Sequence, residues 1–486
     1  MSDSIWTDFA TAQAREDGYL LATTISPSRP PSDPARLYNY LRWTNAGSVQ
    51  TDLRYKLQYN PDLHLDKKES SNWLEVFTAY YHFTARLLSA EEAQNTSQRA
   101  READWNGVYE SWKDVLNAVY RGYTSDVFDA WTIPCLYVVA KYMRIFAIKA
   151  DESATAAAQR EQRDTGMAFG LQDEDGFNTS SNSKNEKLED AARHINRIFA
   201  LCLGDRSPLE DSRKWALYYI ANLLFKTYFR LNSVPLSKNI LRSLSAQAAG
   251  ELPPLSRFPK AHQVTFKYYS GVIAFLSEDY AAAEEHLESA YKMCLHSSND
   301  SAAQTATATA TTRNRDLILT YLIPTKLLTS HRLPTPTLLS QSPHLTSLFA
   351  PITSAIKHAD LRAFTAALES GEDEFVKRRI YLTLERGRDI LLRNLFRKVF
   401  IAGGFEAAAK EGEAPARRTR VPVWEFAAAL QMRGAEVGDG EGGVDGDEVE
   451  CLVANAIYKN FMKGYIARDR GIVVLSKAGA FPGTGV

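Results

Sequence analysis

Hydrophobic positions recur every three to four residues along most of this chain, which predicts a mainly α-helical protein. One apolar stripe is made by Trp73, Val76, Phe77, Tyr80, Tyr81 and Thr84. A second stripe is made by Trp105, Val108, Tyr109, Trp112, Val115 and Leu116. Aromatic stripes at helical spacing are typical of packing surfaces, so we expect both to lie in a helical core and not around a cofactor.

The strength of this pattern divides the chain. Residues 1–35 form an N-terminal segment, and 36–150 form an N-terminal helical region. Residues 151–189 lose the periodicity and gain Ser, Asn, Asp and Gln, which predicts a disordered insertion. Helical periodicity resumes over 190–400, where the Ala-Thr tract at 297–312 predicts a mobile loop.

Small residues at repeat spacing occur within the second helical region. Gly271, Ala283, Leu287 and Ala290 stand at the relative offsets of a tetratricopeptide (TPR) unit. Small side chains at these offsets let two paired helices approach closely. The pattern therefore predicts a TPR-like solenoid, whose last repeat needs a cap because each pair is buried only by its neighbours.

The final region, 401–486, changes from helix to strand patterning. Residues 421–430 read as a helix with proline in its first turn. After a glycine-rich acidic linker, 447–458 repeats apolar residues at helical spacing. Residues 465–467 and 472–475 then read as two short strands around a polar turn. A helix followed by a small hairpin predicts a winged helix as the cap of the solenoid.

Composition bounds the class of protein. The chain has 486 residues, 45% hydrophobic and 24% charged, as in ordinary globular proteins. Its four cysteines lie far apart without a CxxC pair, which favours buried thiols in a reducing compartment over a zinc site. The N-terminus lacks a signal-peptide pattern and the apolar runs are short. We therefore expect an intracellular protein that does not enter the membrane.

No catalytic or cofactor pattern is convincing. Gly438–Gly443 matches GxGxxG, but no strand precedes it and its acidic residues would repel a pyrophosphate, so it reads as a linker. The chain lacks a GxxxxGK[ST] segment, and its nine histidines form no HExxH motif. We predict that the protein is not an enzyme and has neither a cofactor nor a metal site.

The clearest chemical signal is positive charge in the last quarter of the chain. The net charge is −1, so binding of nucleic acid would have to rest on local clusters. One cluster consists of Lys377, Arg378, Arg379, Arg386, Arg388, Arg393, Arg397 and Lys398. A second consists of Lys459, Lys463, Arg468, Arg470 and Lys477, and a third of Arg417, Arg418 and Arg420. Charge alone fits phosphates of a nucleic acid and an acidic protein partner equally well.

Several strings resemble a known family. Asp447–Tyr458, Lys463–Ile466 and Val474–Lys477 resemble the end of a PCI domain. The similar branch holds the PCI subunit of the nuclear transcription–export complex and its signalosome-associated paralogue. Upstream, Pro31–Leu37 and Trp131–Tyr137 are more similar to the fungal signalosome-subunit-twelve homologues than to the export subunit.

The resemblance implies a fold and a function. It implies a TPR-like solenoid capped by a winged helix, with the PCI domain at about 230–482. It implies a non-catalytic scaffold of a nuclear complex in transcription-coupled mRNA splicing and export, with the cytoplasm as a second compartment. The implied partners are a larger PCI scaffold, a small acidic disordered subunit of the proteasome-lid type, and RNA or DNA. The alternative is a structural subunit of a signalosome- or lid-like assembly that binds no nucleic acid.

The resemblance also implies roles for particular residues. The residues expected to bind nucleic acid are Lys459, Lys463, Arg468, Arg470, Lys377, Arg378, Arg379, Arg393, Arg397 and Lys398. The residues expected to bind the partner are Val449, Leu452, Tyr465, Ile466 and Phe481.

Overall fold

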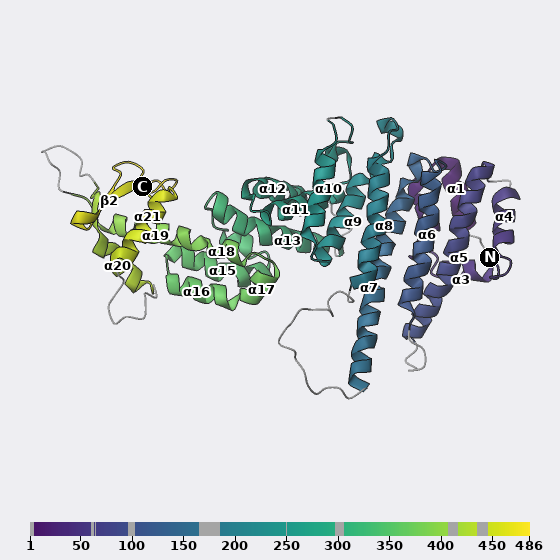
Figure 1. The fold of residues 1–486 in the computed structure, drawn as a ribbon, viewed down its shortest axis with the longest axis horizontal. Coiled ribbons are helices and arrows are strands. Elements are labelled where there is room, and N and C mark those ends of the chain that lie inside the picture. Colours follow the sequence, from purple (N-terminus) through teal and green to yellow (C-terminus); the bar gives the residue numbers. More distant parts are fainter. Residues whose placement is uncertain are drawn as a thin grey trace. The chain divides into compact units, whose positions relative to one another are not determined.

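A computed structural model of the chain describes most of its residues (Figure 1). The described residues are 4–59, 63, 65–95, 103–164, 185–248, 250–296, 306–406, 417–434 and 446–486. The chain divides into two compact units, Met1–Tyr269 (unit 1) and Ser270–Val486 (unit 2), and the division falls inside helix α11 (Lys260–Phe275). We describe each unit by itself.

The described part of unit 1 is helical. Its α-helices are α1 (Ser4–Arg15), α2 (Gly18–Thr24), α3 (Arg36–Arg42), α4 (Val49–Tyr59), α5 (Lys67–Asn95), α6 (Trp105–Thr124), α7 (Ile133–Asp164), α8 (Glu186–Leu203), α9 (Leu217–Arg230), α10 (Val234–Ser245) and the first part of α11. From α4 to α10 each helix packs against the next in the sequence, as the neighbouring ribbons of Figure 1 show. This nearest-neighbour packing is that of a helical-repeat solenoid.

The two predicted aromatic stripes form the core of unit 1. Every residue of both stripes is buried, and Trp73 and Trp112 are completely so. Trp112 satisfies its indole N–H by donating to the carbonyl oxygen of Val139 on α7, at 3.0 Å. Burial of such large rings supplies much of the apolar driving force for folding.

Helix α7 is long and apolar. The stretch Ala130–Arg160, which joins a short 3-10 turn at 130–132 to most of α7, has the length and composition of a membrane span, a property that the short apolar runs had not suggested. However, 56% of its most apolar stretch is buried inside unit 1, where it packs between α6 and α8. The burial is that of a core helix.

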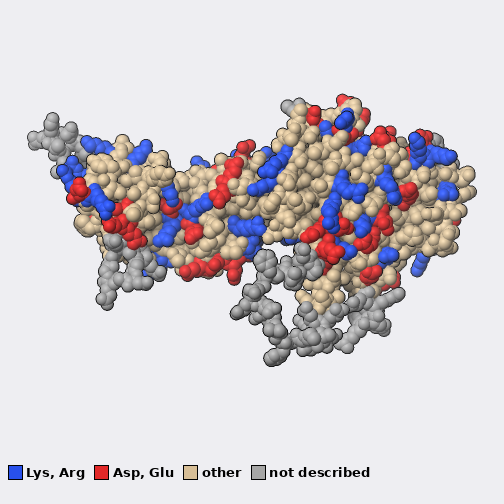
Figure 2. Space-filling view, viewed as in Figure 1, with Lys and Arg blue, Asp and Glu red and all other residues tan. Residues whose placement is uncertain are grey.

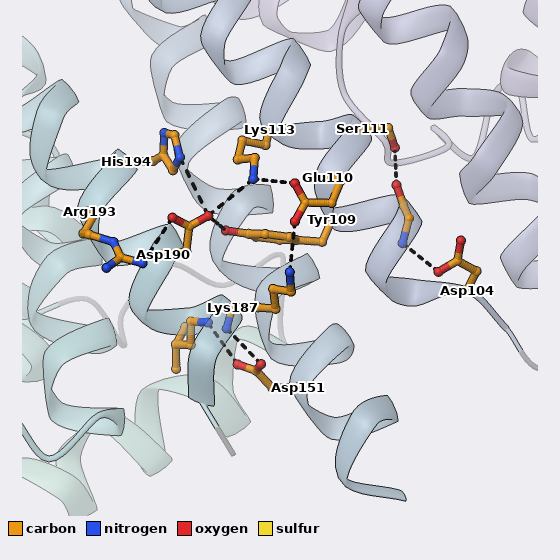
Figure 3. A network of polar contacts seen from close by, with 12 residues as sticks. Asp104, Tyr109, Glu110, Ser111, Lys113, Asp151, Lys187, Asp190, Arg193 and His194 are labelled. Carbon is orange, nitrogen blue, oxygen red and sulfur yellow. Dashed lines mark hydrogen bonds and ion pairs between the residues drawn. The ribbon is translucent and has the colours of Figure 1, made fainter. Parts of the chain in front are cut away.

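A polar network joins α6, α7 and α8 (Figure 3). The hydroxyl of Tyr109 donates to Asp190 at 2.8 Å, and Lys187 pairs with Glu110 at 3.0 Å. The carboxylate of Asp151 accepts the backbone N–H groups of Lys187 and Leu188, at 3.0 and 2.9 Å. Asp151 on α7 therefore caps the beginning of α8, whose first N–H groups have no partner within their own helix.

This network corrects the predicted insertion at 151–189. Helix α7 continues through 151–164, and α8 begins at Glu186. The alanine-rich sequence after Asp151 has high helix propensity, and the contact of Asp151 with α8 anchors it. The remainder, 165–184, lies outside the described residues.

Unit 2 begins with a close helical pair. An added Cβ at Gly271 of α11 would lie 2.6 Å from Cγ of Leu287 on α12 (Tyr280–His296). Ala283, Leu287 and Ala290 are fully buried. The small-residue spacing therefore marks a real close approach of two helices, as predicted.

The remaining helices of unit 2 lead to the C-terminal module. They are α13 (Ala306–Thr329), α14 (Pro336–Leu339), α15 (Pro343–His358), α16 (Leu361–Ser370), α17 (Glu372–Lys377), α18 (Tyr381–Glu385) and α19 (Gly387–Ala402). The prediction of a mobile loop at 297–312 is wrong for residues 306–312, which belong to α13. Alternating Ala and Thr residues can form a helix where they continue into an apolar helical segment. Residues 297–305 lie outside the described part.

The C-terminal module is a winged helix. After α19 come β1 (Arg420–Pro422), α20 (Val423–Met432), α21 (Gly446–Tyr458), β2 (Gly464–Ala467) and β3 (Ile472–Leu475). The strands form an antiparallel sheet in the order β1-β3-β2, and α20 and α21 pack against each other and against α19. Gly471 closes the hairpin turn with a φ of +59°, in the left-handed region that favours glycine. The mainly helical fold ending in this small sheet confirms the predicted fold class.

Candidate nucleic-acid and partner surfaces

The cations of the C-terminal hairpin differ in how far they are neutralised. Lys459, at the end of α21, pairs with Asp389 of α19 at 2.6 Å. Arg468 pairs with Asp447 at 2.7 Å. Each of these pairs lowers the positive charge that the module offers to a phosphate.

Lys463 and Arg470 are the stronger candidates. Both are exposed, and neither forms an ion pair with a carboxylate of the described chain. Lys463 precedes β2, and Arg470 lies in the turn between β2 and β3. Lys477, after β3, is likewise exposed without such a pair, so the predicted hairpin cluster retains three unneutralised cations.

The cluster near α17 is partly neutralised by one carboxylate. Glu374 accepts a hydrogen bond from Nε of Arg378 at 2.7 Å, and its carboxylate lies 3.9 Å from Nζ of Lys377. The hydrogen bond from Arg378, with the nearby charges, lowers the pKa of Glu374. Arg379 is exposed, with a φ of +59°. Among the basic side chains that pair with Glu374, that of Lys377 is the most exposed, at 78%.

The cations of α19 are not equivalent, and one prediction is corrected. Arg393 is only 8% exposed, and its guanidinium lies 5.9 Å from the ring centroid of Phe461. Burial lowers its pKa, and Arg397 lowers it further. Arg397 is half-buried and donates to the carbonyl oxygen of Thr484 at 3.4 Å, whereas Lys398 is exposed and donates to that of His358 at 2.8 Å. Arg393 is therefore a packing residue and not a surface contact.

Two of the three cations of the third cluster are engaged within unit 2. Arg418 pairs with Glu425 at 2.7 Å. Arg417 lies over the ring of Phe405 at 4.8 Å, and Arg420 stands exposed on β1. The predicted cations therefore do not form one continuous free surface, and Figure 2 shows Lys and Arg interleaved with Asp and Glu over the face that it draws.

Two of the five predicted partner-binding residues belong to the core. Val449 and Phe481 are completely buried, and the Phe481 ring packs 5.8 Å from that of Phe400. Leu452 and Ile466 are half-buried, and Tyr465 is 63% exposed. A periodic apolar stripe marks the inner face of a helix in a small module as readily as an interface, which is why the sequence did not separate them.

The strand register reveals an apolar face that sequence reasoning missed. Val421 and Val473 are paired and buried on the inner face of the sheet. On the opposite face Tyr465 pairs with Val474, and Ala467 pairs with Ile472. We call this the outer sheet face, and its apolar members, all exposed or half-buried, are Tyr465, Ala467, Ile472, Val474 and Pro422. The exposed Arg420, which pairs with Val474, borders them on β1. The alternation within β1 was the available signal, but three residues were too few to distinguish from a helix start.

Three further large apolar side chains of the module are exposed. They are Trp424 at 68%, Met432 at 85% and Tyr458 at 89%. Groups of three or more His, Cys, Asp or Glu with metal-binding geometry do not occur among the described residues. The GxGxxG match at 438–443 lies outside them.

Comparisons with known proteins identify relatives of this chain. The family model of the PCI domain matches residues 368–477, a shorter range than the predicted 230–482. A protein from Neurospora crassa described as "Protein CSN12 homolog" is 50% identical over 488 residues, covering 100% of both chains. A protein of the same description from Gibberella zeae is 50% identical over 98% of both chains. "PCI domain-containing protein 2" from Xenopus laevis is 30% identical over 82% of this chain and 83% of its own.

Proposed function

Because this chain belongs to the family of the CSN12 homologues and PCI domain-containing protein 2, we propose that it is a scaffold subunit of a nuclear complex. Its winged helix pairs with a larger PCI protein and presents cations to RNA or DNA. A small acidic disordered subunit completes the complex, which acts in transcription-coupled mRNA maturation. Proteins of the PCI scaffold family are generally non-catalytic, and the proposed role needs no catalysis.

The outer sheet face carries the pairing half of this proposal. Its aromatic member, Tyr465 on β2, is 63% exposed, and its neighbours Ala467, Ile472 and Val474 are aliphatic and incompletely buried. Aromatic residues surrounded by aliphatic ones are typical of the centre of protein–protein interfaces. Strand β2 also lies at the edge of the described sheet, so one side of this strand is not paired with another strand of the sheet.

The nucleic-acid half rests on Lys463 and Arg470. Both are exposed at the ends of the hairpin strands, where unneutralised cations could contact phosphates of a bound strand. Lys459 and Arg468 would have to leave their carboxylates to do so. We therefore expect Lys463 and Arg470 to contribute more to nucleic-acid binding than Lys459 and Arg468 do.

Substitution of Tyr465 tests the pairing. We expect Tyr465→Glu to weaken the complex with a co-expressed larger PCI protein at least about 30-fold, as loss of an aromatic anchor does. Analytical ultracentrifugation of the purified complex measures the Kd. Tyr55→Glu is the matched control, because Tyr55 is 67% exposed in unit 1. Unchanged affinity for Tyr465→Glu would show that the outer sheet face is not the interface.

Charge reversal tests nucleic-acid binding. In anisotropy titrations of the complex with RNA and DNA, we expect K463E/R470E to weaken binding more than K459E/R468E and to flatten the salt dependence. The two double variants change the charge equally. The site assignment fails if both leave the affinity and its salt slope as they are in the wild type.

The alternative is a structural subunit of a signalosome- or lid-like assembly without nucleic-acid binding. The pairing of Lys459 with Asp389 and of Arg468 with Asp447 favours it, because these cations are already neutralised. Affinity purification from cells separates the two functions. Recovery of signalosome subunits without mRNA-processing factors would support the alternative.

A further inference from the structure

Four helical segments of unit 1 carry positive charge only. No Asp or Glu occurs in 133–150 of α7, in α9, in α10 or in 260–269 of α11. Together these segments contain Lys141, Arg144, Lys149, Lys226, Arg230, Lys238, Arg242, Lys260 and Lys267. Such bias within an otherwise balanced chain of net charge −1 concentrates positive potential locally.

Three of these cations lie close together where α7 packs against α9. The guanidinium of Arg144 donates to the backbone carbonyl oxygen of Lys226 at 3.4 Å. Desolvation lowers the pKa of Lys226, and the charges of Arg144 and Lys141 lower it further. Desolvation likewise lowers the pKa of Arg144, and nearby Arg230 adds to that effect.

Of these four cations, Lys141, Arg144, Lys226 and Arg230, the last alone pairs with a carboxylate of the described chain. Arg230 pairs with Glu152 at 2.7 Å. Lys141, Arg144 and Lys226 form no ion pair with a described carboxylate, and Nε of Arg144 is buried without a hydrogen-bond partner. Arg144 is half-buried, whereas Lys141 and Lys226 are exposed. Like charges held close together raise the free energy of the unbound protein, and a bound anion would lower it.

Half-buried aromatic rings lie among the cations. Lys141 stands over the ring of Tyr142 at 5.2 Å. The ring of Tyr219 lies 4.2 Å from that of Tyr137 and 5.1 Å from that of His262. Burial lowers the pKa of His262, the charge of Lys226 lowers it further, and Nδ1 of His262 is buried without a hydrogen-bond partner. One side of each tyrosine ring is packed, Tyr142 on Phe146 and Tyr219 on Tyr137, and both residues remain half-buried beside the cations of α7 and α9.

We propose that this surface binds single-stranded nucleic acid, with phosphates on the cations and bases against the rings. We name it the repeat surface and define it by Lys141, Arg144, Lys226, Tyr142, Tyr219 and His262. Stacking on aromatic side chains beside a cationic track is how proteins hold single strands without reading their sequence. An acidic protein segment would use the cations but would not need the rings. The repeat surface belongs to unit 1 and does not rest on the function proposed for the winged helix.

The test is fluorescence anisotropy of the full chain with an oligo(U) of about 15 nucleotides, between about 50 and 200 mM salt. We expect K141E/K226E to weaken binding at least about tenfold, and K141A/K226A to lower the salt slope by about 1.4, or about 0.7 for each phosphate contact. K67E/K68E is the matched control, since these exposed lysines lie on α5. It should bind as the wild type does.

Two comparisons make the result decisive. The loss in K141E/K226E should persist in a K463E/R470E background, which separates the repeat surface from the winged helix. Oligo(U) should also displace the labelled strand at lower concentration than polyglutamate of equal charge. Wild-type binding by K141E/K226E, with an unchanged circular dichroism spectrum, overturns the inference. Equal competition by polyglutamate also overturns it and assigns the surface to an acidic protein.

Discussion

Gly271 lies where α11 passes α12 with no space for a side chain. A Cβ there would be 2.6 Å from Cγ and 2.9 Å from Cδ2 of Leu287, which is itself fully buried. We expect Gly271→Ala to lower the free energy of unfolding by about 1–3 kcal/mol, the usual cost of overpacking a core. Chemical denaturation followed by circular dichroism measures the change.

Gly403 offers the matched control within the same unit. Its φ is −63°, and an added Cβ would meet no atom closer than 3.5 Å. Gly403→Ala should leave stability unchanged or raise it slightly, because alanine restricts the unfolded chain. Equal effects of the two substitutions would contradict the close approach of α11 and α12.

Single residues also show where sequence reasoning about the site reached its limit. Lys463 and Arg393 are both cations near apolar neighbours, yet the first is exposed and the second is 8% exposed. A long aliphatic stem lets arginine line a core while its charge stays near the surface, so residue type alone does not decide exposure. The opposite error occurred at Phe481. This apolar residue was predicted to bind the partner, but it is buried in the core of the C-terminal module.

At the scale of elements, the junction of α6 and α8 depends on an ionised carboxylate. Burial acts to raise the pKa of Asp190, but the hydrogen bond from Tyr109 and the charges of His194 and Lys113 outweigh it, so the pKa is lowered. The folded-state pKa thus lies below the unfolded value of about 3.9. The stabilisation is complete above that value and is lost as the pH falls through the folded-state pKa.

This gives a prediction for Asp190→Asn. We expect the variant to be less stable than the wild type by about 1–2 kcal/mol at pH 7, the cost of a charge-assisted hydrogen bond. The difference should shrink as the pH falls from about 4 toward about 2. Urea unfolding across this pH range measures it, and a constant difference would show that the charge of Asp190 is immaterial.

The elements themselves were largely predictable, for a physical reason. Helical periodicity is local, so the stripes of α5 and α6 and the helix α21 were foreseen from sequence. Strand β1 was missed because its three residues become a strand only by pairing with β3, more than forty residues later. The extent of α7 was missed because its anchor is a contact with α8 through Asp151.

At the scale of the whole molecule, the four cysteines report on folding. Cys135, Cys202 and Cys294 are buried, and burial raises their pKa values, that of Cys202 to about 12. Cys451 on α21 is exposed. Since the thiolate is the reactive form, the buried thiols should be inert in the folded chain.

We therefore expect one thiol to react rapidly with Ellman's reagent in the native protein and four to react in denaturant. The Cys451→Ser variant should lose the rapid phase and serve as the control. Rapid reaction of more than one thiol would contradict the packing of the buried cysteines. With Cys135 and Cys202 in unit 1 and Cys294 in unit 2, the slow phases also report the opening of each unit separately.

The acid-free helical segments that carry the repeat surface have a practical consequence at the bench. A protein whose formal net charge is −1 would ordinarily pass through a heparin column at neutral pH. With Lys141, Arg144 and Lys226 unneutralised, the chain should instead be retained and should carry host nucleic acid through purification. Its absorbance ratio at 260 and 280 nm must therefore be brought down with a high-salt wash before any stoichiometry is interpreted.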